Sequence, residues 1–327
     1  MKIGLIQTRQ HIVYDPRKPG DIDLRAIREA QRVGYDRAFN MMEQAADDGA
    51  DLLVTIEAFN GGLHPDDERY DFAEAGETID SPLMERFALL AGRRKVHVVA
   101  GLYTRRHEHV YNSAVLFGPE GRIIGIFDKV HLPAGEDRTI TPGDQFPVFD
   151  TDLGRIGMLV CYDLHYPEAA RCMAMAGADV ICVPTWGWEK KYGPTRAYEN
   201  HLTVAAAMGV PWSGHIWDIC DPSAVVDCMG NVIDEGPPDG EAVVLAEVAI
   251  HADRATPAAA RTLPHHAAGL QPRGIARRLM NAREKHMSGD RRETACPVQA
   301  SPVRRAQAAR ARADHSPASS ARHASQW

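Results

Sequence analysis

The sequence lacks several patterns that mark common classes of protein. None of its six cysteines, at positions 161, 172, 182, 220, 228 and 296, belongs to a C-x-x-C pair, which argues against a zinc ribbon or a thioredoxin-type redox site. No stretch approaches the ~20 apolar residues of a membrane span. The start, MKIGLIQTRQH, has only a short apolar run and so lacks the apolar region of a secretory signal. We therefore expect a cytoplasmic protein without a membrane partner, whose cysteines are mostly free thiols.

Basic residues are scarce in the body of the chain and concentrated after it. The 327 residues carry a formal net charge of -7, but the segment from 251 onward holds 14 Lys and Arg against 5 Asp and Glu, which leaves -16 for the body and +9 for the tail. The tail is poor in large apolar side chains, so it buries too little surface to offset chain entropy. We predict one folded domain over 1–255 and a basic extension over 256–327, with an amphipathic helix at 275–287 and disorder beyond about 295.

The first 250 residues alternate strand-like runs with helix-length segments, which predicts an α/β fold. Helices are expected over 23–49, 81–94, 166–177 and 194–208. Two helices end alike, in DDGADLLV at 47 and MAGADVIC at 175, where glycine can close the helix before a buried strand. This repeat suggests two related halves of one sheet system. The expected strands are KIGLIQT near the start, DLLVTIE at 51, VHVVAGLY at 96, SAVLFG at 113, RIIGIFD at 122, RIGMLVC at 155, ADVICVP at 178, SAVVDC at 223 and EAVVLAEV at 241.

Three expected strands end in chemically reactive side chains. DLLVTIE ends in Glu57, RIIGIFD is followed by Lys129, and RIGMLV is followed by Cys161. Functional groups collect at the carboxyl ends of strands in open α/β sheets. A carboxylate can take the thiol proton, and an ammonium can lower the thiol pKa and stabilise an oxyanion. A buried structural cysteine, a solvated glutamate and a surface lysine are the alternatives, and spacing alone does not decide between them.

Longer segments around these residues form an ordered set of motifs. They are LLVTIEAFNG around Glu57, IFDKVHLPAGE around Lys129 and GMLVCYDLHYPEAAR around Cys161, with further segments TPGDQFPVF at 141, P-T-W after ADVICV, RAYENH at 196 and SAVVDCMGNVI at 223. The set resembles the nitrilase superfamily, the carbon–nitrogen hydrolases, over roughly residues 1–250. The resemblance implies a four-layer αββα sandwich and a Glu-Lys-Cys triad made of these three residues.

The resemblance also implies roles for other residues. Glu136 would be the family's second glutamate, which orients Lys129 and the attacking water. Relatives often carry proline where Ile56 stands and a basic residue such as Arg where His165 stands. In many relatives the segment after the position of Val248 packs on a partner subunit, whereas low-complexity sequence follows here. We nevertheless expect a homodimer or a higher homo-oligomer.

Substrate contacts are predicted from residues beside the expected cleft. Tyr162 would help hold an oxyanion through its backbone N–H, His165 lies near the expected mouth, and Trp186, like Trp188, follows a strand end that faces it. Packing is the alternative for the tryptophans. A carboxylate-bearing substrate would need a cation, for which the candidates are His165, Lys190, Lys191 and Arg196. Arg171 and Glu199 are predicted to be buried ion-pair partners.

The sequence therefore predicts a hydrolase of non-peptide carbon–nitrogen bonds. The substrate would be a small amide, carbamoyl compound or nitrile, water would be the second reactant, and no metal or organic cofactor is required. Amide or carbamoyl hydrolysis is favoured over nitrile hydrolysis. Two alternatives are a catalytically idle scaffold and a nucleic-acid-binding protein that uses the basic tail. The tail lacks interleaved aromatic residues, so we do not expect nucleic acid as a partner.

Overall fold

The computed structural model describes residues 1–9, 24–61, 76–187, 189–210 and 221–250. The predicted domain boundary at 255, the helix at 275–287, the basic tail and Trp188 lie outside the described residues, so these predictions stay untested. Within the described residues, no helix is both long and apolar enough to cross a bilayer.

In the part of the chain that the structure describes, twelve strands form two six-stranded sheets. In each sheet three neighbouring strands that include its centre are parallel, and antiparallel strands flank them. The first sheet has the order β12 (Ala242–Glu247), β1 (Lys2–Gln7), β2 (Leu52–Thr55), β3 (His97–Arg106), β4 (His109–Gly118), β5 (Arg122–Asp128). The second has the order β11 (Val232–Glu235), β10 (Ala224–Val226), β9 (Thr203–Met208), β8 (Val180–Thr185), β7 (Gly154–Met158), β6 (Val148–Thr151).

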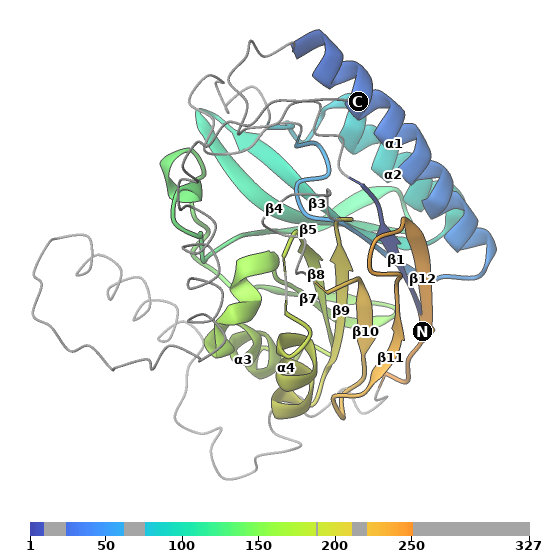
Figure 1. The fold of residues 1–327 in the computed structure, drawn as a ribbon, viewed down its shortest axis with the longest axis vertical. Helices are drawn as coiled ribbons and strands as arrows, with labels where there is room; N and C mark the ends of the chain where they lie inside the picture. Colours follow the sequence, from blue (N-terminus) through green and yellow to red (C-terminus); the bar gives the residue numbers. More distant parts are fainter. Residues whose placement is uncertain (10–23, 62–75, 188, 211–220, 251–327) are drawn as a thin grey trace, which may run out of the picture. The chain divides into compact units, whose positions relative to one another are not determined.

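Helices cover the outer face of each sheet (Figure 1). Helices α1 (Leu24–Asp47) and α2 (Pro82–Arg94) contact the first sheet, and α3 (Pro167–Met175) and α4 (Tyr192–Asn200) lie on the side of the second. The two sheets contact each other through β1, β2 and β3 on one side and β8 and β9 on the other. The predicted four-layer αββα sandwich is therefore confirmed.

The local sequence explains where the helices begin and end. The Ser81 side chain accepts a hydrogen bond from the Met84 N–H at 3.4 Å, and Pro82 occupies the first turn of α2, where its missing N–H costs nothing. Gly49 after α1 and Gly177 after α3 have φ of 85° and 92°, which glycine adopts without steric cost. Both predicted glycine helix ends are confirmed, and they make β1-α1-β2 and β7-α3-β8 similar units.

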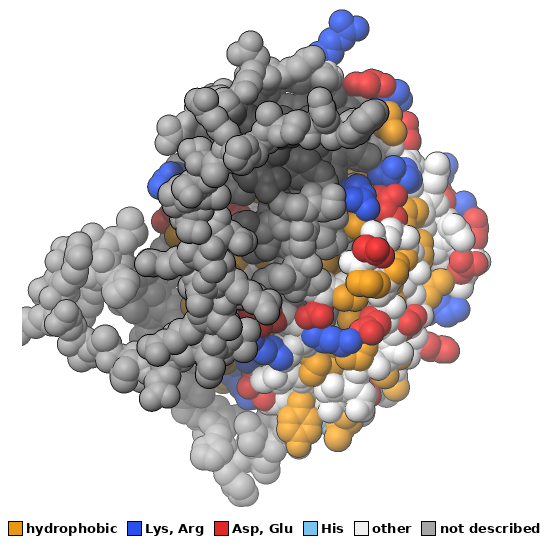
Figure 2. Space-filling model, viewed as in Figure 1, with side chains coloured by type: hydrophobic (Ala, Val, Ile, Leu, Met, Phe, Trp, Pro, Cys, Tyr) orange, Lys and Arg blue, Asp and Glu red, His pale blue; other side chains and the backbone are white. Residues whose placement is uncertain are grey.

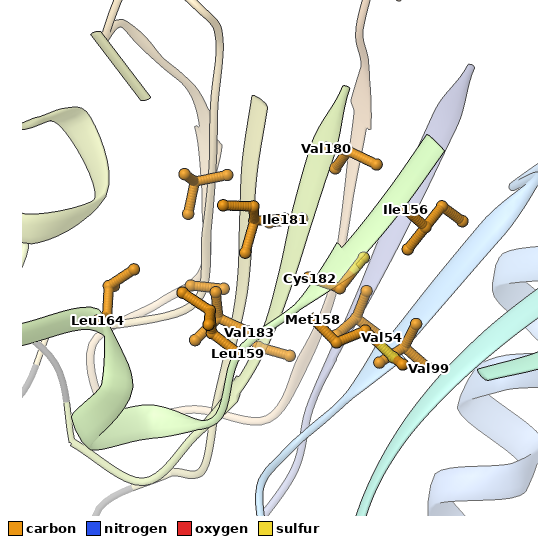
Figure 3. Packing of buried hydrophobic residues seen from close by; sticks show 14 of the residues in the cluster. Val54, Val99, Ile156, Met158, Leu159, Leu164, Val180, Ile181, Cys182 and Val183 are labelled. Atoms are coloured by element: carbon orange, nitrogen blue, oxygen red, sulfur yellow. The ribbon is translucent and has the colours of Figure 1, made fainter. Parts of the chain in front are cut away.

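The largest core cluster lies between the sheets. Figure 3 shows Val54 and Val99 of the first sheet beside Ile156 and Met158 of the second, all fully buried. A second cluster fills the space between the first sheet and its helices, where Phe87 packs against other aromatic rings. Burial of apolar surface at about 25 cal/mol per Å² is the main force that holds such layers together. The two clusters also fix the strand ends that carry the reactive side chains.

The predicted helix over 194–208 is wrong in its second half. Helix α4 ends at Asn200, where His201 adopts a left-handed φ of 54°, and residues 203–208 form the buried strand β9. Its sequence TVAAAM is rich in alanine, which favours helices in isolation. Small side chains suit a strand that is buried on both faces between packed layers, so the tertiary environment overrides the local preference. Strands β6 and β11 were also not expected.

Charged side chains of both signs are interspersed over the outside of the helices on the first sheet (Figure 2). Arg93 and Arg94 of α2 form ion pairs with Glu43 of α1, and Arg94 also pairs with Asp47 at 2.6 Å. Exposed pairs of this kind contribute little individually. The packing of these helices on the first sheet therefore depends mainly on the apolar cluster between them.

Candidate active site

The fold places the three reactive side chains at strand ends, as the sequence predicts. Glu57 follows β2, Lys129 follows β5 directly, and Cys161 lies three residues beyond β7. Glu57 and Lys129 are almost fully buried, with 4% and 2% of their surface exposed, whereas Cys161 is half-buried. The first two belong to one sheet and the cysteine to the other, so the packing of the sheets brings the three strand ends to the same region.

Lys129 lies between two buried carboxylates. Its Nζ donates hydrogen bonds to Glu57 Oε1 and to Glu136 Oε2, each at 2.8 Å. Burial alone would lower the pKa of Lys129, but the two carboxylates raise it well above its usual range. Burial raises the pKa of Glu136, Lys129 opposes this shift, and Glu57 adds to it. The cluster thus contains a fixed ammonium and two carboxylates that repel each other, an arrangement that perturbs pKa values.

Glu57 retains one oxygen that is available to accept a proton. Oε1 accepts hydrogen bonds from Lys129 and Asn112, whereas the buried Oε2 has no partner among the described residues. A buried acceptor without a partner is costly in a folded protein. Such an oxygen is suited to a general base, because its acceptor capacity becomes useful when a substrate or a thiol proton arrives.

Cys161 begins the short helix η3 (Cys161–His165) in a strained conformation, with φ of 46°. Left-handed backbone is uncommon for residues other than glycine and marks positions that the surrounding structure holds in place. The thiol donates a hydrogen bond to the Gly187 carbonyl at 3.6 Å. The chain therefore presents the sulfur on a sharp turn between β7 and α3.

The thiol pKa differs from the expectation that Lys129 lowers it. Burial raises the pKa of Cys161 to about 12, Glu57 adds to the shift, and Lys129 opposes it without overcoming it. The prediction was incomplete because it considered only the ammonium. Desolvation and the Glu57 charge both disfavour the thiolate, and together they outweigh the attraction of Lys129. Cys161 is therefore a neutral thiol at neutral pH, and attack requires a base to remove its proton. The thiol donates to the Gly187 carbonyl, and the preceding residue, Trp186, donates to the Glu57 carbonyl, so Cys161 and Glu57 contact the same short segment after β8.

A family model provides the deciding comparison, since the model of the carbon–nitrogen hydrolases matches residues 21–258. The chain belongs to the carbon–nitrogen hydrolase family. The predicted family and enzyme class are thereby confirmed. This carbon–nitrogen hydrolase is 34% identical to a nitrilase of Pyrococcus abyssi over 178 residues, which are 53% of the chain and 67% of the relative. It is 27% identical to an omega-amidase of Homo sapiens over 230 residues, 65% of the chain and 81% of the relative.

Other matches of this carbon–nitrogen hydrolase cover less of the relative. The match to a citrullinase of Francisella tularensis is 32% identical over 148 residues, 43% of the chain and only 52% of the relative. Among the first relatives the chain thus spans between about half and two thirds of their length.

Solved structures share the fold. The Nit3 protein of Saccharomyces cerevisiae superposes with a TM-score of 0.65 at 22% identity, covering 83% of this chain and 96% of that one. The amidase of Nesterenkonia sp. AN1 has a TM-score of 0.61 at 25% identity and covers 76% and 93%. One variant of that amidase is in complex with butyramide, and another carries acrylamide added at its active-site cysteine.

Of the three predicted substrate-binding residues of this carbon–nitrogen hydrolase, two lie side by side and the third contacts the Glu57 turn. The ring of Tyr162 lies 4.7 Å from that of His165, which stacks on Tyr192 at 4.4 Å. Burial lowers the pKa of His165, Glu189 opposes this shift, and the charge of Arg196 adds to it. Trp186 donates its indole N–H to the Glu57 carbonyl at 2.8 Å. Trp186 therefore holds the turn after β2 in place, and substrate contact by these three residues stays a prediction.

The candidate cations for a substrate carboxylate are already engaged, apart from His165. Lys190 forms an ion pair with Glu235, and Lys191 pairs with Glu189. Arg196 is buried, donates to the Leu164 and His165 carbonyls at 3.1 and 3.0 Å, and pairs with Glu199 at 3.1 Å. The prediction that Arg171 is an ion-pair partner is wrong. Arg171 donates to the Glu199 backbone carbonyl at 2.9 Å, and the Glu199 carboxylate forms its ion pair with Arg196.

Sequence reasoning missed residues that hold the site together. Asn112 of β4 donates to Glu57 Oε1 at 2.7 Å and to Glu136 Oε1 at 2.8 Å. Asp163 is fully buried and accepts hydrogen bonds from the backbone N–H groups of Val160 and His131. A polar residue inside an apolar strand, such as Asn112 in YNSAVLFG, is the available signal, since a buried polar group needs partners. Among the described residues, no group of three His, Cys, Asp or Glu side chains could hold a metal ion.

Proposed function

We propose that this carbon–nitrogen hydrolase cleaves small neutral amides through a thioester on Cys161 and releases ammonia or an amine. The observation that carries the proposal is the buried cluster in which Lys129 bridges Glu57 and Glu136 at 2.8 Å while Glu57 Oε2 stays unpaired among the described residues. A catalytically idle scaffold gains nothing from an unpaired buried carboxylate oxygen beside a neutral thiol, so the cluster counts against that alternative.

In the first step Glu57 Oε2 accepts the proton of the Cys161 thiol as the sulfur bonds to the amide carbon. The electron pair of the carbonyl π bond moves onto the oxygen, and the Lys129 ammonium with the Tyr162 N–H stabilises the resulting oxyanion. The oxyanion then collapses, the carbon–nitrogen bond breaks, and the protonated Glu57 gives its proton to the leaving nitrogen. The thiol pKa of about 12 makes this transfer to a base necessary, because almost no thiolate exists at neutral pH.

In the second step water attacks the thioester carbon. Glu57 accepts one proton of the water, and Glu136 holds Lys129 and helps to orient that water. Collapse of the second oxyanion breaks the carbon–sulfur bond, and the sulfur takes the proton back, which regenerates the thiol and releases a carboxylic acid. In both steps the proton is carried by Glu57, and the negative charge on oxygen is stabilised by Lys129 and the Tyr162 N–H.

Two observations favour a neutral amide as the substrate. Lys190, Lys191 and Arg196 are paired with carboxylates, and His165 has a lowered pKa, so none of these four predicted candidates is a free cation for a substrate carboxylate. The similar Nesterenkonia amidase binds butyramide in one of its variants. Carbamoyl compounds and nitriles remain the competing substrates, and the homo-oligomer and the cytoplasmic location remain predictions.

The test is an ammonia-release assay over three matched panels: aliphatic amides such as butyramide, N-carbamoyl amino acids, and the corresponding nitriles. We expect turnover of the amides with kcat/KM at least about tenfold above that of the other panels, a difference that corresponds to about 1.4 kcal/mol. Preferred turnover of N-carbamoyl amino acids would contradict the neutral-amide proposal. Ammonia release that is the same with the Cys161→Ala variant would contradict the thioester.

A further inference from the structure

Asn112 contacts each charged member of the cluster. Its Nδ2 donates to Glu57 Oε1 at 2.7 Å and to Glu136 Oε1 at 2.8 Å, and its backbone carbonyl accepts the Lys129 N–H at 2.8 Å. It is 1% exposed and belongs to β4, which pairs with both β3 and β5. Glu57 and the Lys129–Glu136 segment, which are distant in the sequence, thus share one asparagine.

The orientation of the Asn112 amide follows from its neighbours. The two carboxylate oxygens can only accept, so the NH₂ group must face them, because the amide oxygen in that place would repel both. The remaining Oδ1 is buried and has no partner among the described residues. An apolar side chain would suit this position in β4 better if its role were only to fill space. The cost of burying the amide therefore indicates that its two donated hydrogen bonds serve the carboxylates.

The two amide bonds also determine which carboxylate oxygen is free. Lys129 and Asn112 together occupy Glu57 Oε1 and both oxygens of Glu136. Of the four carboxylate oxygens, only Glu57 Oε2 lacks a partner among the described residues. Without the amide, rotation of the Glu57 carboxylate would leave either oxygen able to bind the ammonium, and the free acceptor would no longer have a defined position.

We propose that Asn112 is a positioning residue of the reaction, which fixes Glu57 Oε2 as the proton-accepting atom and holds the two carboxylates in place beside a single ammonium. The inference rests on the proposed thiol chemistry of Cys161. It concerns the position of a proton acceptor and the net charge of the buried cluster. Two carboxylates and one ammonium leave one negative charge in excess, which the amide dipole partly offsets.

Removal of the amide should therefore change the pH at which the cluster takes up a proton. Burial raises the pKa of Glu136, and the hydrogen bond from Asn112 acts against this shift. In Asn112→Ala the pKa of Glu136 rises further, and in Asn112→Asp a third carboxyl group adds to the repulsion. A proton on Glu136 removes a negative charge beside Glu57 and so weakens Glu57 as a base toward Cys161. The acidic limb of Cys161 reactivity should therefore move to higher pH.

The experiment measures the rate at which iodoacetamide alkylates Cys161 as a function of pH, read by mass spectrometry of the Cys161 peptide in the full-length chain. We expect the acidic limb to lie about one pH unit higher in Asn112→Ala than in the wild type, and higher again in Asn112→Asp. Asn112→Ser keeps one hydroxyl donor and a small volume, so it provides an intermediate shift if the Asp variant does not fold.

Ser113→Ala is the matched control. Ser113 is the next residue of β4, is fully buried, and bonds Thr104 and Asp128 on the opposite face of the strand. We expect its acidic limb to coincide with that of the wild type. An unchanged limb in folded Asn112→Ala and Asn112→Ser, or an equal shift in Ser113→Ala, would overturn the role of Asn112. Alkylation needs no substrate, so a wild type that hydrolyses no amide would overturn the proposed function without deciding the role of Asn112.

Discussion

Asp163 joins the turn of Cys161 to the loop that follows Lys129, because its Oδ1 accepts the backbone N–H of His131 at 2.8 Å. The same oxygen lies 2.8 Å from His131 Nδ1, and Oδ2 accepts the Val160 N–H at 3.1 Å. Asp163 is fully buried, and the His131 ring stacks on Tyr166 at 3.8 Å. The Asp163 carboxylate thus links the segment that carries Cys161 to the segment that carries Lys129.

Asp163→Asn should reduce stability by about 2–4 kcal/mol, because the new NH₂ group must face N–H donors inside the protein. Urea denaturation measures the change in the free energy of unfolding. The control is Asp150→Asn, since the Asp150 side chain is 83% exposed and bonds Arg155 at 3.0 Å. We expect the control to lose less than about 1 kcal/mol. Equal losses in the two variants would refute a special role for the buried carboxylate.

Glu57→Gln should change the pH dependence of Cys161 alkylation. With the carboxylate present, the base removes the thiol proton, and the alkylation rate should vary little between about pH 7 and about pH 9. In the glutamine variant only spontaneous ionisation supplies thiolate. Burial, the largest cause of the raised thiol pKa, remains in this variant, so the rate should then rise about tenfold per pH unit over this range.

Parallel pH profiles in the wild type and Glu57→Gln would show that Glu57 does not act as the base toward Cys161. Cys172 and Cys182 are fully buried, with pKa values also raised by burial, and they provide an internal comparison in the same digest. Their labelling should stay far below that of Cys161 in the folded protein.

Lys129→Met should make stability depend on pH in a defined direction. The change removes the ammonium that opposes the rise in the pKa of Glu136, so this carboxyl group binds its proton more tightly in the folded than in the unfolded chain. A carboxyl group whose pKa is raised by folding makes the folded protein less stable as pH rises. We expect a loss of about 3–5 kcal/mol at about pH 8 and a smaller one at about pH 5. Amide turnover should fall at least about 100-fold.

The control for this charge removal is Lys95→Met, because the exposed Lys95 side chain donates a hydrogen bond to the Pro119 carbonyl at 3.1 Å and lies outside the buried cluster. Its stability should change by less than about 1 kcal/mol at both pH values. Thermal denaturation at the two pH values decides the matter. A Lys129→Met variant that is more stable at the higher pH would contradict the charge assignment.

Gly101→Ala should displace Glu57, the proposed base. A Cβ at Gly101 in β3 would lie 2.5 Å from the Ile56 carbonyl oxygen and 2.9 Å from Glu57 Cα, which are closer than van der Waals contact. Backbone must therefore shift at the residue that carries the base. We expect a loss of stability of about 1–3 kcal/mol together with a loss of kcat of about 100-fold, because small misplacement of a catalytic group is costly.

Gly240→Ala is the comparison for this variant, since its Cβ would meet only the Pro237 ring, at 3.2 Å. A ring at the surface can shift slightly, so kcat should stay within about twofold of the wild type. If Gly101→Ala retained wild-type kcat, the close packing of β3 on the Glu57 turn would have no functional role.

Much of the fold and part of the site could be predicted from the sequence because their signals are local. The change from apolar to polar residues at Glu57, Lys129 and Cys161 marks strand ends, and glycine marks two helix ends. Strand β9 was missed because its alanine-rich sequence favours a helix in isolation, and only burial between two layers makes it a strand.

The supporting residues could not be predicted because their roles depend on distant partners. Asn112 is 55 residues from Glu57 and 24 from Glu136 in the sequence, so its function appears only when β2, β4 and the loop after β5 are folded together. The thiol pKa was misjudged for a related reason. A sequence shows which charges are present, but desolvation of Cys161 depends on how the layers enclose it.

The central claim is that Cys161 carries the substrate as a thioester, and peptide mass spectrometry of the enzyme quenched during turnover tests it most directly. The wild type should be mixed with a saturating aliphatic amide, quenched in acid within the steady state and digested. We predict that the Cys161 peptide gains the mass of the acyl group, that hydroxylamine removes it, and that Cys161→Ala shows neither the adduct nor ammonia release. Steady-state ammonia release with an unmodified Cys161 peptide, or wild-type turnover by Cys161→Ala, would contradict the account.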